Sequence, residues 1–284
     1  MKHPYVISQD ACDLLKQFGI FPSAEAKTLV QRRLTQILQD SFPDNEVHFI
    51  SDDEMTIRLA KMVRESPLLS IWQNRTYRGS HLPTNTIEVT RAVLPSGENT
   101  PGLTSRNDNL NIEEQIARIP HGDYSLVDDV IFSGESTMCL VALLAEKGIT
   151  IKEVHAAIVI GNGHNVVSRS GIKVSGVVTY DNVVDEVCER DFIIGIPYGG
   201  RAVIGEPVRK SLHYVLPWGK PTEWASIPPK HAVSFSKRCL ALSIDFWEMV
   251  NPKIKLSEVP QLPVGAPDED VYFVDYLHQM LEQL

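Results

Sequence analysis

The residues with the clearest chemical potential lie in one segment, YSLVDDVIFSGEST, which spans residues 124–137. An apolar run ends in two adjacent carboxylates, Asp128 and Asp129, which suit the hydroxyls of a sugar or a magnesium ion. The loop that follows opens a helix, whose first N–H groups and dipole favour a phosphate. The segment therefore predicts a sugar-phosphate site, in which the loop residues are Ser133, Gly134, Glu135, Ser136 and Thr137.

The elements that must position this segment are expected to form a parallel sheet. The pattern predicts a strand over 124–127, a helix over 136–147 and a second strand over 154–160, with further strands over 173–179 and 192–196. A strand–helix–strand unit of this length is typical of parallel sheets covered by helices. Ligands bind such sheets at the carboxyl ends of the strands, where Asp128 and Asp129 lie. The expected fold class is α/β with a mainly parallel sheet.

The flanking sequence predicts helices at both ends. An amphipathic helix is expected over 24–40, with Ser23 as its N-cap. The tail after residue 216 is expected to form a helical extension that packs on the sheet domain, with helices over 235–250 and 271–284. These patterns divide the chain into three parts: an N-terminal helical segment (1–45), an α/β domain (46–215) and a C-terminal helical extension (216–284).

Composition excludes several classes of protein. Net charge is −9, from 27 Lys and Arg against 36 Asp and Glu, which argues against dedicated nucleic-acid binding. The four cysteines lie far apart without metal-ligand spacing, as in proteins with reduced thiols. The first residues are too polar for a secretory leader, and no apolar stretch is long enough to cross a membrane. We expect a soluble, cytoplasmic protein with no membrane partner.

The segment 124–137 resembles the phosphoribosyl pyrophosphate (PRPP) motif of type I phosphoribosyltransferases. That motif is an apolar strand, two acidic residues, two or three mostly apolar positions and then Thr/Ser-Gly-x-Thr/Ser. The resemblance implies that Asp128 and Asp129 bind the ribose hydroxyls, with Mg²⁺ as cofactor, and that residues 133–137 hold the 5-phosphate. The implied activity is transfer of phosphoribosyl from PRPP to a nitrogenous base, with release of pyrophosphate. Implied partners are PRPP or a nucleotide and a base-like small molecule, and a homodimer is one assembly to test.

Three positions depart from the family pattern. Purine-specific members often carry an Asp general base three residues after the second acid, where this chain has Phe132. Glu135 stands inside the phosphate loop, where its charge would repel the ligand unless the side chain points away. The family's pyrophosphate loop follows the first strand, which is expected over 47–50. The residues after that strand, 51–54, are acidic and contain no glycine.

The segment FIIGIPYGG, residues 192–200, supports two interpretations. Its glycines could expose backbone N–H groups to pyrophosphate. Alternatively, residues 191–195 match the base-side segment of hypoxanthine-type members, and this interpretation is favoured because it keeps the family's order. Either interpretation makes Phe192, Gly199 and Gly200 candidate substrate-binding residues. A plain surface turn remains a third alternative.

Further candidates are spread over several loops. The polar loop 95–111 lies where the family carries a mobile catalytic loop, and Arg91 and Arg106 are its candidates for neutralising pyrophosphate. Arg75 and Arg78 are further cationic candidates. His164 is expected at the same sheet edge as the PRPP motif, as a possible acid or base.

Other functions stay open. A receiver-like phosphoacceptor domain also begins with an acidic pair, and Asp181 could be its further acid, but residues 161–172 are expected to supply no second helix. A non-catalytic PRPP or nucleotide sensor is favoured by Phe132 and by the acidic residues 51–54. A hydrolase that cleaves a nucleotide's N-glycosidic bond would use similar chemistry with water. The simplest alternative for the acidic pair is a capped turn with solvated carboxylates.

Overall fold

The computed structural model describes residues 2–73, 85–106, 109–267 and 270–284. Its contacts divide the chain into two compact units. Unit 1 comprises residues 1–50, 93–98 and 184–284, and unit 2 comprises residues 51–92 and 99–183. This division differs from the three consecutive segments expected from the sequence, because the N-terminal and C-terminal parts share one hydrophobic core.

Unit 2 contains a five-stranded sheet in the order β10-β9-β8-β3-β4. Every neighbouring pair in it is parallel, which confirms the expected α/β fold with a parallel sheet. Buried strand residues such as Ile71, Leu126 and Val154 form its core with the helices. The strands are β3 (Leu69–Gln73), β4 (Asn85–Ile87), β8 (Gly122–Ile131), β9 (Ile149–Ile160) and β10 (Lys173–Tyr180).

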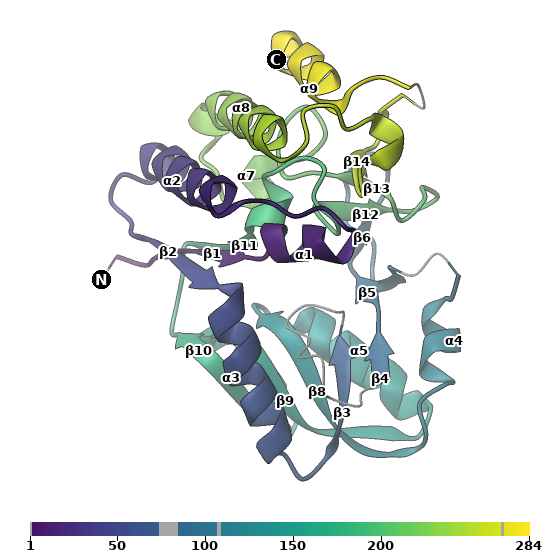
Figure 1. Ribbon diagram of the computed structural model, residues 1–284. Coiled ribbons are helices and arrows are strands. Elements are labelled where there is room, and N and C mark those ends of the chain that lie inside the picture. Colours follow the sequence, from purple (N-terminus) through teal and green to yellow (C-terminus); the bar gives the residue numbers. More distant parts are fainter. Residues whose placement is uncertain (1, 74–84, 107–108, 268–269) are drawn as a thin grey trace. The chain divides into compact units, whose positions relative to one another are not determined.

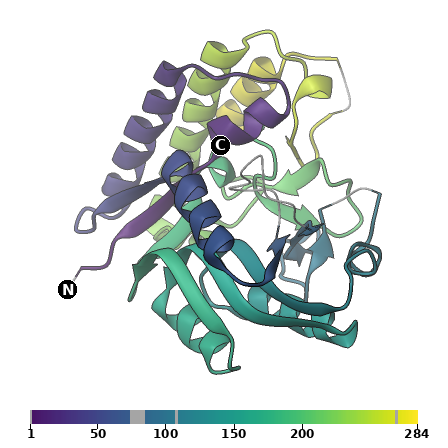
Figure 2. The same cartoon turned by 60° about the horizontal axis from the view of Figure 1, so that its bottom comes forward.

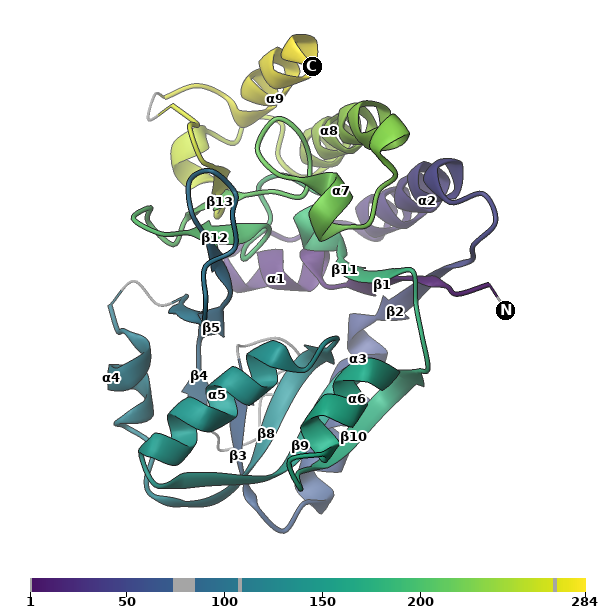
Figure 3. The same ribbon diagram turned by 180° about the vertical axis from the view of Figure 1, so that it is seen from behind.

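Helices cover both faces of this sheet. Helix α3 (Asp52–Glu65) lies on one face (Figure 1), whereas α5 (Glu135–Glu146) and α6 (Gly161–Ser168) lie on the other (Figure 3). Short α4 (Ile112–Ile116) and the antiparallel pair β5 (Val89–Thr90) and β7 (Thr104–Ser105) complete the unit. The expectation that residues 161–172 hold no helix is wrong, because α6 forms from a Gly- and Asn-rich stretch of low helix propensity.

The strand expected to open the α/β domain belongs to unit 1 instead. Strand β2 (Val47–Ser51) joins β1 (Tyr5–Gln9) and β11 (Asp185–Cys188) in the order β11-β1-β2. A second sheet of this unit has the order β14-β13-β12-β6. Its strands are β6 (Ala92–Val93), β12 (Arg201–Val203), β13 (Lys210–Leu212) and β14 (Leu262–Pro263).

The helices of unit 1 come from both ends of the chain. Helix α2 (Ala24–Ser41) begins at Ser23, whose Oγ accepts a hydrogen bond from the Ala26 N–H at 3.2 Å, as expected of an N-cap. It packs beside α8 (Ala232–Val250) (Figures 1 and 2), and α8 also packs against α9 (Phe273–Gln283). The C-terminal helices therefore pack with the N-terminal helix. Two short helices, α1 (Ala11–Gln17) and α7 (Pro221–Trp224), also belong to unit 1.

The expected strand over 192–196 is absent from the described structure. These residues form turns after a 3-10 turn (Glu189–Asp191), and Phe192, Ile193, Ile194 and Ile196 are fully buried. A short apolar run can be a buried segment of any type, so its hydrophobicity alone did not specify a strand. Among the helices that the structure describes, none is both long and apolar enough to span a membrane.

Candidate functional site

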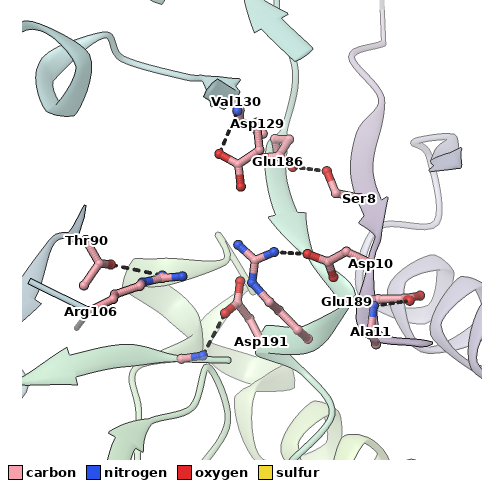
Figure 4. Close-up of polar contacts among 12 residues, drawn as sticks. Ser8, Asp10, Ala11, Thr90, Arg106, Asp129, Val130, Glu186, Glu189 and Asp191 are labelled. Atoms are coloured by element: carbon pink, nitrogen blue, oxygen red, sulfur yellow. Dashed lines mark hydrogen bonds and ion pairs between the residues drawn. The ribbon is translucent and has the colours of Figure 1, made fainter. Parts of the chain in front are cut away.

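Asp128 and Asp129 lie near the carboxyl end of β8, with parallel strands on both sides. Asp128 is 4% exposed and Asp129 is half-buried. The Asp128 carboxylate accepts a hydrogen bond from the Asp129 N–H, and the Asp129 carboxylate accepts one from the Val130 N–H, both at 2.9 Å (Figure 4 draws the second). The backbone itself therefore holds the two side chains.

The surroundings of Asp128 are unfavourable to its charge. Burial and the neighbouring Asp129 carboxylate raise the pKa of Asp128 well above its usual value, although a hydrogen bond from the Thr137 side chain lowers it. Such a pair is stabilised by a cation or by hydroxyl donors. Mg²⁺ usually takes only one or two protein carboxylates and completes its shell with water and substrate phosphates. The residues present thus fit Mg²⁺, although the described residues contain no group of three metal-ligating side chains.

The 133–137 loop joins β8 to α5. Gly134 occupies the N-cap position of α5 in the left-handed conformation, at φ 79°, and offers no side chain to cap the helix. The Glu135 N–H reaches only the Ser133 Oγ, at 3.4 Å. The Glu135 side chain is exposed. The loop thus presents the positive end of a twelve-residue helix close to the two carboxylates.

A polar pocket of about 670 Å³ lies at the carboxyl ends of β9 and β10 and at the start of α6. It contains His164, as expected for a residue at this sheet edge, and also Asp181. Among the described residues that line it there is an acid but no lysine or arginine, so it suits a neutral hydrogen-bonding ligand better than a phosphate. Its lining residues are Gly161, Asn162, His164, Asn165, Thr179, Asp181 and Asn182.

Several pocket residues were not predicted from the sequence. Asn162 and Asn165 follow strand β9 directly, and Thr179 and Asn182 lie at the end of β10. The available signal was the polar stretch GNGHN after a long apolar strand, because the carboxyl ends of neighbouring parallel strands meet at one edge. The sequence could not show which strands are neighbours.

The candidate lid arginines are held differently. Arg106 Nη2 donates to Thr90 Oγ1 at 3.1 Å (Figure 4), whereas Arg91 is exposed. Within the loop 95–111, β7 pairs with β5. Arg75 and Arg78 lie outside the described residues.

The fold also relocates the pyrophosphate-loop position that the resemblance implied. Residues 52–65 form helix α3, and the strand before them, β2, is not in the five-stranded sheet. The parallel neighbours of β8 are β9 and β3, and β3 ends at Gln73. Residues 74–84, which follow β3, lie outside the described residues.

Phe192, Gly199 and Gly200 are all in unit 1. The Phe192 side chain is fully buried and contacts the Phe235 ring, with centroids 5.2 Å apart. The Gly200 N–H donates to Asp191 Oδ1 at 2.8 Å. An added Cβ at Gly199 would lie 2.5 Å from the Arg190 carbonyl oxygen, which explains the glycine by close packing.

A buried polar cluster follows β1 and β11 in the same unit. Arg190 forms a buried ion pair with Asp10, and Glu189 Oε1 accepts from the Ala11 N–H at 3.0 Å (Figure 4). Glu189 Oε2 has no hydrogen-bond partner in the described part of the chain, and burial raises the pKa of Glu189 to about 7. Sequence reasoning did not single out this cluster, because buried charges cannot be recognised without knowing what covers them.

Part of this chain is similar to phosphoribosyltransferases of known structure. Orotate phosphoribosyltransferase from Aeropyrum pernix is 17% identical over 45% of this chain and 70% of that chain, with a TM-score of 0.31. Adenine phosphoribosyltransferase from Thermoanaerobacter pseudethanolicus is 13% identical over 45% and 79%, with a TM-score of 0.33. The adenine enzyme from Rhodothermus marinus is 18% identical over 45% and 78%, with a TM-score of 0.32. No protein-family model and no curated protein sequence matches the chain.

Proposed function

We propose that this chain binds PRPP with Mg²⁺ and transfers its phosphoribosyl group to a nitrogenous base. The observation that carries the proposal is the pair Asp128 and Asp129 at the carboxyl end of a central parallel strand, directly before a helix that starts at a left-handed glycine. Carboxylates for hydroxyls and a helix N-terminus for phosphate together describe a ribose 5-phosphate.

In this proposal the acidic pair and the loop bind different parts of the ligand. Asp128 and Asp129 bind the ribose hydroxyls, and the 133–137 loop binds the 5-phosphate. Bound Mg²⁺ would be held by the same two carboxylates and would neutralise charge on the pyrophosphate. The C1–O bond to pyrophosphate breaks, pyrophosphate leaves with the electron pair, and a nitrogen of the base forms the new bond to C1 while its proton passes to solvent. The chain contributes position and electrostatics.

The polar pocket at β9 and β10 is the place we propose for the base. Its amides, the His164 ring and the Asp181 carboxylate offer both donors and acceptors to a heterocycle. Asp181 would accept from a ring N–H, and the amides could serve carbonyl or amino groups.

A nucleotide sensor without catalysis is the second candidate, and Phe132 favours it. This residue occupies the position where purine-specific members often have an Asp base, and its side chain is 39% exposed. A sensor would keep the affinity for PRPP but would not consume it.

The deciding experiment combines calorimetry and product detection. Wild-type protein is titrated with PRPP and Mg²⁺, and pyrophosphate is then measured with orotate, adenine, hypoxanthine and uracil as acceptors. Binding with pyrophosphate release supports the transferase, and binding without release for any base supports the sensor. Absence of PRPP binding would contradict both.

A further inference from the structure

The first turn of α6 packs against the carboxyl end of β8, which leads into the 133–137 loop. At Gly163, an added Cβ would lie 2.5 Å from the Phe132 carbonyl oxygen, 2.8 Å from Ile131 Cγ2 and 3.0 Å from the Ile131 carbonyl oxygen. From the other side, an added Cβ at Gly134 would lie 3.2 Å from the Gly163 carbonyl oxygen. The two glycines thus allow helix and loop to approach more closely than any side chain would permit.

The close approach of the Phe132 and Ile131 backbone explains why residue 163 is a glycine. Gly163 is helical and has no positive φ, so its backbone does not require glycine. Glycine inside a helix costs about 0.5–1 kcal/mol relative to alanine. The contact with Phe132 and Ile131 accounts for the residue, because alanine would force the backbone of one partner to move.

The same turn also lines the polar pocket. Gly161, Asn162, His164 and Asn165 face the pocket, whereas Gly163 between them is buried against the strand end. Successive helical residues point about 100° apart, so one turn can contact two places at once. A shift of this turn must change the pocket lining and the contact with residues 131–134 together.

We propose that the first turn of α6 couples the polar pocket to the 133–137 loop, with Gly163 as the positioning residue. The coupling rests on the proposed function in one respect, namely that the loop binds a phosphate. Occupation of the pocket changes the phosphate affinity of the loop, and by thermodynamic reciprocity a phosphate in the loop changes the pocket by the same factor.

The first test measures ribose 5-phosphate binding by calorimetry in wild-type, Gly163→Ala and Ser168→Ala proteins. Ser168→Ala is the control, because it lies in the last turn of the same helix and away from the strand end. We expect Gly163→Ala to weaken binding at least tenfold and the control to stay within twofold. Equal affinity in a folded Gly163→Ala protein would overturn the coupling.

The second test uses the wild-type chain, so it is informative even if the Gly163 variant does not fold. Backbone amide resonances are followed while ribose 5-phosphate is added. Shifts at residues 133–137 together with residues 161–165 support the coupling, and shifts confined to 133–137 overturn it while leaving the proposed function intact. No binding at all would overturn the proposed function, and the coupling would fall with it.

Discussion

At the scale of single residues, the main feature of the proposed site is a buried carboxylate whose charge is unfavourable until a ligand binds. Asp128 is buried beside Asp129, and its raised pKa reports the unfavourable charge. Hydroxyl donors or a divalent cation would relieve that cost on binding. If the proposed function holds, the acidic pair would contribute to affinity for the ligand more than to the stability of the unliganded fold.

Replacing both acids tests this directly. Asp128→Asn with Asp129→Asn should weaken binding of PRPP with Mg²⁺ at least tenfold, about 1.4 kcal/mol, because neutral amides accept from hydroxyls and bind Mg²⁺ more weakly than charged carboxylates do. The melting temperature should not fall, since a buried charge is removed. Calorimetry and thermal melts measure the two effects.

Asp123→Asn is the matched control for the acidic pair. Asp123 lies at the exposed end of the same strand, 3.7 Å from Lys152 Nζ. It should leave PRPP affinity unchanged. A folded double variant with wild-type affinity would remove the acidic pair from the site.

Arg106 allows the pyrophosphate end of the ligand to be tested separately. If this residue neutralises pyrophosphate, Arg106→Ala should weaken PRPP binding several-fold and leave ribose 5-phosphate binding unchanged, because only PRPP carries the leaving group. Arg118→Ala, at an exposed arginine of unit 2, is the control. Equal losses for both ligands would assign Arg106 a structural role through its bond to Thr90 instead.

The sequence predicted some of these residues and missed others for a physical reason. Asp128, Asp129 and the 133–137 loop are contiguous, so one segment carries the whole pattern. The pocket residues and Gly163 acquire their roles from neighbouring strands and from a contact between two backbones. Such information depends on strand order and packing, which no local pattern contains.

At the scale of elements, the buried segment 192–196 shows how backbone hydrogen-bonding groups can find partners outside a sheet. The Ile194 N–H donates to Ser243 Oγ at 3.0 Å, and the Ile194 carbonyl accepts from Trp247 Nε1 at 2.7 Å. Helix α8 thus supplies with side chains what a neighbouring strand would supply with its backbone.

Removing the hydroxyl of Ser243 should therefore destabilise unit 1. Ser243→Ala leaves the buried Ile194 N–H without an acceptor, which should lower the free energy of unfolding by about 1–3 kcal/mol. Ser234→Ala, at an exposed serine of the same helix, should change it far less. Urea unfolding of both variants measures the difference. Equal stability would mean that water replaces the lost hydroxyl.

The long periodic elements were predicted well and the short ones poorly. Helices α2, α5 and α8 and strands β8 to β10 lie within a few residues of their expected ranges. Helix α6 was missed because its first residues, GNG, disfavour a helix in isolation. The strand at 47–50 was predicted, but its sheet was not, since pairing with β1 depends on residues far away in the chain.

At the scale of the whole molecule, stability should depend on pH through Glu189. Burial raises the pKa of this carboxyl from 4.5 to about 7 in the folded chain, although the hydrogen bond from the Ala11 N–H and the charge of Lys27 lower it. Below pH 4.5 the protonated carboxyl contributes on the order of 3 kcal/mol to the free energy of unfolding. This contribution is lost as the pH rises through about 7. Glu189→Gln cannot ionise and should not lose it.

Chemical unfolding at pH 5 and pH 8 measures this effect as a difference between proteins. The comparison is needed because His213 has the opposite effect: burial lowers its pKa to about 3, so the protein loses stability as the pH falls below 6.5. Both proteins contain His213, so its effect cancels in the difference. The stability of Glu189→Gln relative to wild type should rise from pH 5 to pH 8. Glu206→Gln, an exposed control in the same unit, should show no such trend, and a flat difference for Glu189→Gln would mean that this carboxyl is ionised in the fold.

The order in which the chain leaves the ribosome has a consequence for the two units. Unit 2 ends at Val183, so its strands and helices are all synthesised before β11 appears. Unit 1 cannot close until α8 and α9 have been made, because α2 packs on α8 and α8 on α9. The apolar face of α2 therefore stays exposed while about two hundred further residues are synthesised. A nascent chain stalled shortly after unit 2 would be the form most in need of a chaperone.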